Sequence, residues 1–121
     1  MLDSLTPEFV VARQLDAYNA KDIEVWLATY APDAVQCELA GKTLASGQAE
    51  IRMRILPRFS DPNLHATLLK RCVMGQVVID HEVVTCTFPE GLGSIELVCV
   101  YFVENGLIQS ASFSFAKPVM Q

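Results

Sequence analysis

No stretch of this sequence is long and apolar enough for a membrane-spanning helix, which takes about 20 consecutive apolar residues. Residues 1–7 carry no basic group and no extended apolar run, so they do not have the pattern of a secretory signal. We therefore expect a soluble, cytoplasmic protein with no membrane partner.

Basic residues are also scarce. The chain has 9 Lys and Arg residues against 14 Asp and Glu residues, which gives a net charge of −5. Proteins that bind DNA or RNA gather lysine and arginine on one surface to neutralise phosphates. The sequence contains no such basic stripe, so we expect no nucleic-acid partner.

Closely spaced cysteines are missing. The four cysteines, Cys37, Cys72, Cys86 and Cys99, stand singly, and their spacings match no zinc framework. An even number could form disulfides, but a chain without an export signal and with this many apolar residues does not need them. We expect four small buried residues in a reducing cytosol.

Nothing in the sequence indicates a metal site or a cofactor. The two histidines, His65 and His81, are far apart and lack the close ligand pair that a metal site requires. We therefore expect neither a metal nor a cofactor.

Internal repeats, low-complexity segments and interdomain linkers are absent too, and 121 residues fit one domain, residues 1–121. Hydrophobic residues make up 51% of the chain and charged residues 19%. A domain of this size buries roughly two-thirds of its unfolded surface. The chain can therefore form a substantial core.

The first predicted helix begins after Thr6, a favoured N-cap residue, with Pro7 at its first position. Apolar residues then recur at spacings of four and three, which places them on one face. These residues are Val11, Leu15 and Tyr18. Gln14 lies inside this apolar stripe instead of opposite it.

Two further helices follow. The second is predicted from an N-cap at Asp22 to Pro32, which ends it. Its buried face consists of Ile23, Trp26, Leu27 and Tyr30. The third begins after Gly47 and carries Pro57 in its last turn. Its inner face consists of Ile51, Ile55, Leu56 and Phe59.

The strands are predicted from alternation and turn signals. Residues 34–39 form a short strand before a turn at 40–42. Residues 64–74 and 77–88 form a long hairpin around Gly75 and Gln76. Residues 94–103 and 107–116 form a second hairpin around Glu104, Asn105 and Gly106. Asn-Gly is the strongest short hairpin signal.

This order, helices first and long antiparallel strands last, predicts an α+β fold. We expect a cone in which a strongly curved antiparallel sheet wraps around three N-terminal helices. Three helices cannot fill such a sheet completely, so a cavity is expected inside it.

Several segments resemble the nuclear transport factor 2-like superfamily, including its SnoaL-like and ketosteroid isomerase-like members. The opening run QLDAYNAKD, followed by YAPDA and later by VYFVENGLI, carries the resemblance, which extends over residues 8–116. It implies a cone-shaped, cystatin-like fold. The same scaffold serves isomerases, cyclases, epoxide hydrolases, dehydratases and proteins without catalysis, so the resemblance specifies the fold more narrowly than the activity.

The resemblance to ketosteroid isomerase implies roles for individual residues. Counted from Tyr30, the position of its catalytic base is Glu38 in this sequence. Its catalytic tyrosine and its protonated acid, which together stabilise an enolate, fall at Gln14 and at about Val98. Glutamine can donate a hydrogen bond but is not acidic, and valine can donate nothing. The resemblance therefore implies a base without its usual strong donors.

Glu38 and His81 are the candidate acid–base residues beside Gln14. Glu38 alternates with Val35, Cys37 and Leu39, so it points to solvent if those three face the core, or into the pocket if the strand is covered on both sides. His81 could act as a base near neutral pH, or it could be a structural or surface residue.

Two further carboxylates have open interpretations. Around the Gly75–Gln76 turn Arg71 opposes Asp80, which predicts a cross-strand ion pair. The same grouping of aspartate, arginine and acid resembles the epoxide hydrolases of the superfamily. Glu96 either faces the helices, where its pKa would rise, or reaches water at the strand end.

The face assignment of the strand at 94–103 predicts both a pocket and an interface. Val98, Val100 and Phe102 are assigned to the helix side, and together with the aromatics they are expected to line a pocket for a small apolar ligand. These aromatics are Tyr18, Trp26, Phe59, Phe102 and Phe115. Leu97, Cys99 and Tyr101 would then form an apolar outer face, which predicts a homodimer through the sheet.

Three functions remain open at this point. The first is an isomerase or lyase that transfers a proton on a small apolar carbonyl compound, with Glu38 as the base. The second is a non-catalytic binding module that uses the same pocket. The third is a structural dimer with a filled cavity.

Overall fold

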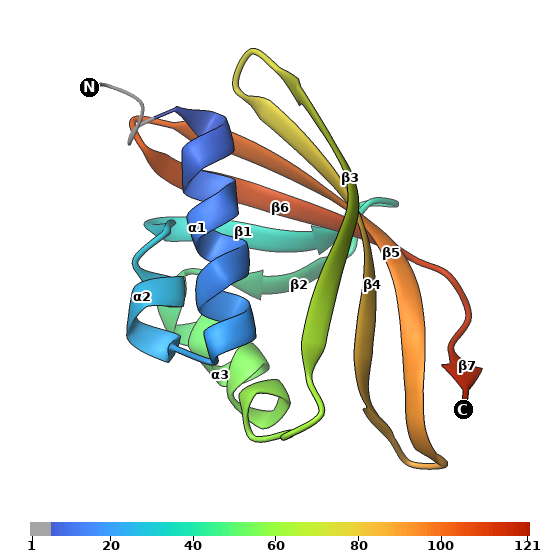
Figure 1. Cartoon of the computed structure of the whole chain (residues 1–121). Helices are drawn as coiled ribbons and strands as arrows, with labels where there is room; N and C mark the ends of the chain where they lie inside the picture. The colour runs from blue at the N-terminus through green and yellow to red at the C-terminus, as the bar shows by residue number, and fades with distance from the viewer. Residues whose placement is uncertain (1–5) are drawn as a thin grey trace.

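The structure is a computed structural model that describes residues 6–121. Helices and strands alternate early in the chain, and strands alone follow (Figure 1). The helices are α1 (Pro7–Ala20), α2 (Ile23–Leu27) and α3 (Gln48–Phe59). The strands are β1 (Tyr30–Glu38), β2 (Thr43–Ser46), β3 (His65–Met74), β4 (Val77–Phe88), β5 (Gly91–Glu104), β6 (Leu107–Phe115) and β7 (Val119–Met120). The predicted α+β class is confirmed.

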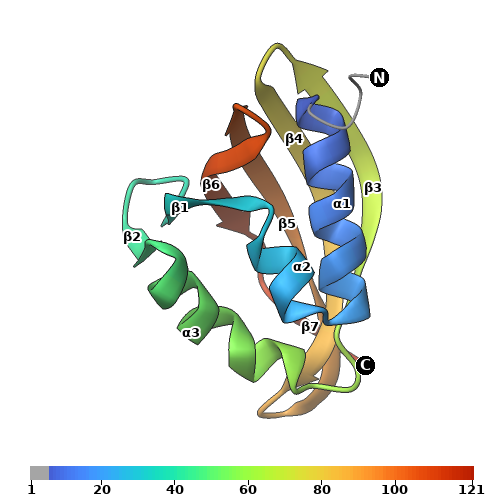
Figure 2. The same ribbon diagram turned by 90° about the vertical axis from the view of Figure 1, so that its left-hand side faces the viewer.

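The sheet runs in the order β2-β1-β6-β5-β4-β3, and β7 pairs with β5 beside this path. Neighbouring strands are antiparallel except β1 and β6, which are parallel. The sheet curves around the helices, with α1 lying across its concave side (Figure 2). This is the expected cone.

Both predicted hairpins form where the turn signals stand. Asn105 and Gly106 have φ values of 57° and 74°, the positive pair that a type I′ turn requires. In the other hairpin Arg71 opposes Asp80, as predicted. The register then shifts between Leu68 and Lys70, and this irregularity changes the alignment of every residue beyond it.

The second helix is shorter than predicted, and its last turn is replaced by strand. The helix ends at Leu27, and the predicted helical residue Tyr30 starts β1 instead. Tyr30 pairs with Ile108 of β6, and the amide of Ile108 donates to the carbonyl of Thr29 at 2.8 Å. Pairing with β6 therefore overrides the apolar spacing that had favoured helix.

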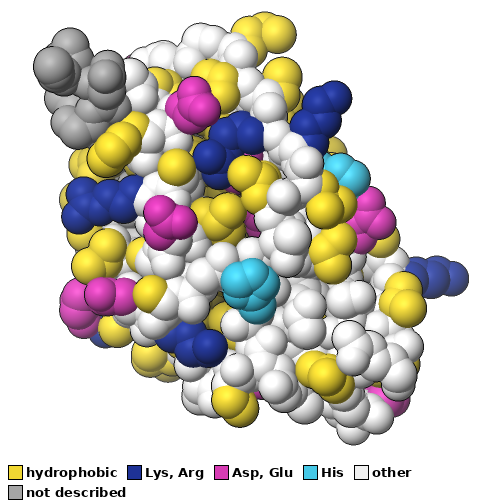
Figure 3. Space-filling model, viewed as in Figure 1, with side chains coloured by type: hydrophobic (Ala, Val, Ile, Leu, Met, Phe, Trp, Pro, Cys, Tyr) yellow, Lys and Arg dark blue, Asp and Glu magenta, His cyan; other side chains and the backbone are white. Residues whose placement is uncertain are grey.

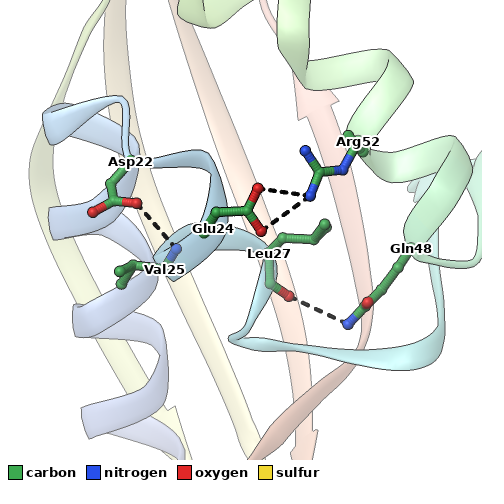
Figure 4. Close-up of polar contacts among 6 residues, drawn as sticks. All are labelled: Asp22, Glu24, Val25, Leu27, Gln48 and Arg52. Atoms are coloured by element: carbon green, nitrogen blue, oxygen red, sulfur yellow. Dashed lines mark hydrogen bonds and ion pairs between the residues drawn. The ribbon is translucent and has the colours of Figure 1, made fainter.

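Contacts between α2 and α3 fix one end of the cone. Gln48 Nε2 donates to the carbonyl of Leu27 at 3.4 Å and to that of Tyr30 at 2.8 Å. Arg52 lies 2.9 Å from the carboxylate of Glu24 (Figure 4). Because α3 is tied to both α2 and β1, its opposite face is directed toward the concave side of the sheet.

The two faces of β5 are reversed relative to the prediction. Cys99 and Tyr101 are 2% and 3% exposed on the helix side. Val98 and Val100 are only half-buried, and Phe102 is 36% exposed on the outer side. Over residues 97–103 both faces of this strand are apolar, so alternation within this stretch does not determine which one packs inward.

The cysteines only partly fit the prediction that all four are buried. Cys86 and Cys99 are buried, Cys37 is half-buried and Cys72 is exposed, and all four are free thiols. Cys72 opposes Ile79 near the end of the first hairpin, where the sheet projects beyond the helices.

The surface over α1 and β3 carries charges of both signs, interspersed with single hydrophobic side chains (Figure 3). Within residues 6–121, no helix is long and apolar enough to cross a membrane.

Candidate functional site

A cavity lies between α1, α2 and α3 and the concave side of the sheet. The centre of a water-sized sphere can move within a volume of about 60 Å³ inside this cavity. One water needs roughly 10–15 Å³ on this measure, so the cavity has room for several waters or for a small organic group. Its walls are formed by Gln14, Leu15, Tyr18, Trp26, Tyr30, Gln36, Arg54, Ile55, Arg58, Glu82, Val84, Ile95, Leu97, Cys99, Tyr101, Phe113 and Phe115. The third function, a structural dimer, requires a filled interior, and this cavity therefore argues against it.

Among the residues that the structure describes, Glu82 is the one carboxylate in this wall. It lies on β4 and is 4% exposed. Its Oε2 is the only buried side-chain nitrogen or oxygen within residues 6–121 that has no hydrogen-bond partner. An unsatisfied buried polar atom costs about 1–3 kcal/mol, more when charged. Such an atom in a cavity wall is a candidate to bind or react with a ligand.

The pKa of Glu82 is raised from 4.5 to about 7. Burial is the main cause, because it disfavours the charged form, and the negative charge of Asp80 adds to it. The positive charge of Arg71 acts in the opposite direction. A carboxyl group with a pKa near 7 can both accept and donate a proton under neutral conditions.

This raised pKa predicts that stability falls as the pH rises. Between 4.5 and about 7 the folded chain keeps a proton on Glu82 that the unfolded chain has lost, so deprotonation favours unfolding. At 1.36 kcal/mol per pKa unit, the loss is about 3 kcal/mol above neutrality. Urea unfolding should show Glu82→Gln gaining stability over wild type on going from about pH 4 to about pH 8. A difference between the two proteins that does not change with pH would contradict the raised pKa.

Gln14 links two aromatic residues in the wall. Trp26 Nε1 donates to Gln14 Oε1 at 3.1 Å, and Gln14 Nε2 donates to the hydroxyl oxygen of Tyr101 at 3.4 Å. Tyr101 accepts in this contact, so its own O–H can donate to another acceptor, of which the neighbouring Cys99 is one. Burial is the main cause that raises the pKa of Tyr101 well above its ordinary value. Tyr101 therefore keeps its proton.

A second polar network lies near α3. Gln36 Nε2 donates to the hydroxyl of Tyr30 at 3.2 Å, and Arg54 Nη1 donates to Gln36 Oε1 at 2.9 Å. The guanidinium of Arg54 also lies 5.6 Å from the ring centre of Phe113. Burial lowers the pKa of Arg54, and repulsion from Arg58 adds to this effect. The wall thus has a cationic part on α3.

The structure brings together some of the residues predicted for the site. Gln14, Tyr18, Trp26 and Phe115 line the cavity. Phe59 is not in the wall but packs behind it, with its ring centre 5.5 Å from that of Tyr18 and 5.7 Å from that of Trp26.

The other predicted residues lie elsewhere. Val98, Val100 and Phe102 are on the outer face of β5 and do not line the cavity. Glu38 ends β1, is half-buried and is not in the cavity wall.

His81 is on the outer face of β4, where it contacts Glu96. Glu96 reaches water, the second of its two predicted interpretations, with 54% of its side chain exposed.

Sequence reasoning missed Glu82, Tyr30 and Tyr101 as site residues. The signal for Glu82 was present in β4, where Asp80 and Glu82 occupy alternate positions between valines. The ion pair predicted for Asp80 does form, with Arg71 at 2.7 and 2.8 Å. Because Asp80 is fully buried, however, the pair belongs to the inner face.

Comparisons with known proteins agree with this architecture. No curated protein matches the sequence significantly. An uncharacterised cystatin-fold protein of Novosphingobium aromaticivorans superposes with a TM-score of 0.82 at 23% identity, covering 90% of this chain and 97% of that one. A Mycobacterium tuberculosis protein in complex with estradiol-17β-hemisuccinate gives 0.77 at 18% identity, covering 92% and 95%.

A computationally designed 17-OHP binder superposes with a TM-score of 0.76 at 19% identity, covering 93% of this chain and 98% of the binder. The model of the SnoaL-like domain matches residues 11–111. The chain therefore belongs to the SnoaL-like domain family and has the nuclear transport factor 2-like, ketosteroid isomerase-like fold.

Proposed function

We propose that this protein transfers a proton on a small apolar carbonyl compound held in the cavity, with Glu82 as the base. The observation that carries the proposal is the unpartnered, buried carboxyl oxygen of Glu82 in a cavity wall. Its pKa of about 7 places it where a general base is most effective. Glu82 thus takes the role that the sequence had suggested for Glu38.

The chemistry requires two groups. Ionised Glu82 removes a proton from the carbon beside the carbonyl, which leaves an enolate, and protonated Glu82 then returns the proton to the same or another carbon. The hydroxyl of Tyr101 supplies a hydrogen bond to the enolate oxygen. One such donor typically contributes a hundredfold or more in rate. Gln14 orients Tyr101, because its amide is already engaged on both sides.

The alternative is a non-catalytic binding module. It is favoured by the polar groups of the wall that already satisfy one another, such as Gln14 with Trp26 and Gln36 with Tyr30. The designed 17-OHP binder and the Mycobacterium tuberculosis protein in complex with estradiol-17β-hemisuccinate, which share this fold, support a pocket for an apolar molecule.

Deuterium exchange separates the two functions. A panel of small enolisable carbonyl compounds is incubated with the protein in heavy water, and exchange beside the carbonyl is followed by NMR. Exchange above the buffer rate supports proton transfer. Specific binding without any exchange supports the binding module.

We also propose a homodimer through the outer face of the sheet. That face is apolar over Ile79, Val83, Val98, Val100 and Phe102. Light scattering should give about twice the chain mass of 13.3 kDa. Val100→Lys, at the centre of this face, should give a monomer, whereas Met53→Lys, at a position 71% exposed on α3, should not. A wild-type monomer at micromolar concentration would refute the dimer.

A further inference from the structure

Two arginines in the cavity wall form no ion pair with an acidic residue of the described part of the chain, residues 6–121. Arg54 and Arg58 are four residues apart on α3, so they lie on the same side of the helix, and both line the cavity. The arginine ion pairs found within residues 6–121 involve Arg52 and Arg71. Arg54 and Arg58 therefore present uncompensated positive charge to the cavity.

The surroundings of Arg54 make this charge costly to leave unpaired. It donates a hydrogen bond to the neutral amide oxygen of Gln36, and none of its five N–H donors reaches a carboxylate of residues 6–121. It is half-buried against the ring of Phe113 and repelled by Arg58, which together lower its pKa. An anion between the two guanidinium groups would relieve the repulsion and supply the missing acceptors.

Glu82 does not fill this role. Within residues 6–121, Glu82 forms no ion pair with either arginine. The arginine that affects the pKa of Glu82 most is Arg71 on β3. Beyond the two arginines the wall is mainly aromatic and aliphatic, with Phe113, Phe115 and Leu97 among its members. The cavity thus combines a cationic part with an apolar body.

We propose that the ligand of this cavity is an apolar carboxylic acid in its anionic form, with its carboxylate bound by Arg54 and Arg58. The inference rests on and deepens the proposed function: the substrate is then an apolar acid that also carries the enolisable carbonyl group, with its reacting carbon toward Glu82. A carboxylate fits the planar donor geometry of arginine, and the small apolar interior accepts its hydrocarbon part.

The test compares a carboxylate with its uncharged counterpart. Cyclohexanecarboxylate and cyclohexanecarboxamide have the same apolar body. They differ in the negative charge that the two arginines are proposed to bind. The only tryptophan of the chain, Trp26, lines the cavity, so its fluorescence reports binding. We expect wild type to bind the carboxylate about tenfold more tightly than the amide, as a charge-assisted hydrogen bond implies.

Single substitutions assign the preference to the two arginines. Arg58→Gln should reduce carboxylate affinity about tenfold and leave amide affinity unchanged. Arg58 is exposed, so this variant should fold. Arg54→Gln should act in the same way. Arg52→Gln is the matched control on the same helix, because Arg52 points toward Glu24 and not into the cavity (Figure 4).

Three results would overturn the inference: no binding of the carboxylate at millimolar concentration, equal affinity for acid and amide, or an equal loss in Arg52→Gln. The proposed proton transfer would survive each of them if neutral carbonyl compounds still exchange in a way that depends on Glu82. Conversely, an arginine-dependent preference without exchange supports the anion site and removes the proton transfer.

Discussion

Glu82→Gln should slow exchange at the carbon beside the carbonyl by a hundredfold or more, the low end for loss of a positioned base. Glutamine has the shape of the protonated carboxyl but cannot accept the proton. Folding should be retained, since the substitution removes a buried carboxylate whose pKa is already raised to about 7. Exchange is measured by NMR on the substrate that wild type processes fastest.

Glu38→Gln is the matched control for that experiment. The substitution is the same, but Glu38 lies at the end of β1 and outside the cavity wall, so exchange should stay at the wild-type rate. Glu82→Asp should keep part of the activity, because the carboxylate remains and its reach is shorter by one methylene. If Glu38→Gln abolishes exchange and Glu82→Gln does not, the base is Glu38. If neither variant changes the rate, the binding module is the better function.

Local signals in the sequence were sufficient to predict most of the elements of the fold. The N-cap at Thr6 forms, with the amide of Phe9 donating to its hydroxyl at 3.2 Å. Both hairpin turns form at the glycines that allow positive φ, Gly75 and Gly106. The helix-to-strand change at Tyr30 could not be predicted in the same way, because it depends on a partner strand that lies 78 residues later, at Ile108.

The site was harder to predict because it depends on which face of each strand packs inward. In β5 the outer face carries Val98, Val100 and Phe102 and is as apolar over this stretch as the inner face, so Glu96, on the same outer face, is the main polar signal for the correct side. In β4 the inner face even carries the acidic residues, Asp80 and Glu82, against the usual rule that charge lies outside. Functional sites commonly depart from the local pattern in this way, because they bury polar groups.

The ion pair between Arg71 and Asp80 should be the most sensitive point of the fold. Asp80 is fully buried and is bonded by Arg71 Nε at 2.7 Å and Nη2 at 2.8 Å. Arg71→Met removes the partner and leaves a buried carboxylate without compensation, which typically costs 3–5 kcal/mol. Urea unfolding should therefore show a loss of about that size near neutral pH. Arg52→Met, which breaks the exposed pair with Glu24, should cost at most about 1 kcal/mol.

A second substitution at Asp80 separates a missing charge partner from missing packing. If Arg71 acts through packing alone, removing the carboxylate of Asp80 as well will not restore the lost stability. Adding Asp80→Leu to Arg71→Met should recover much of the stability, because an apolar pair of similar volume often replaces a buried ion pair without loss.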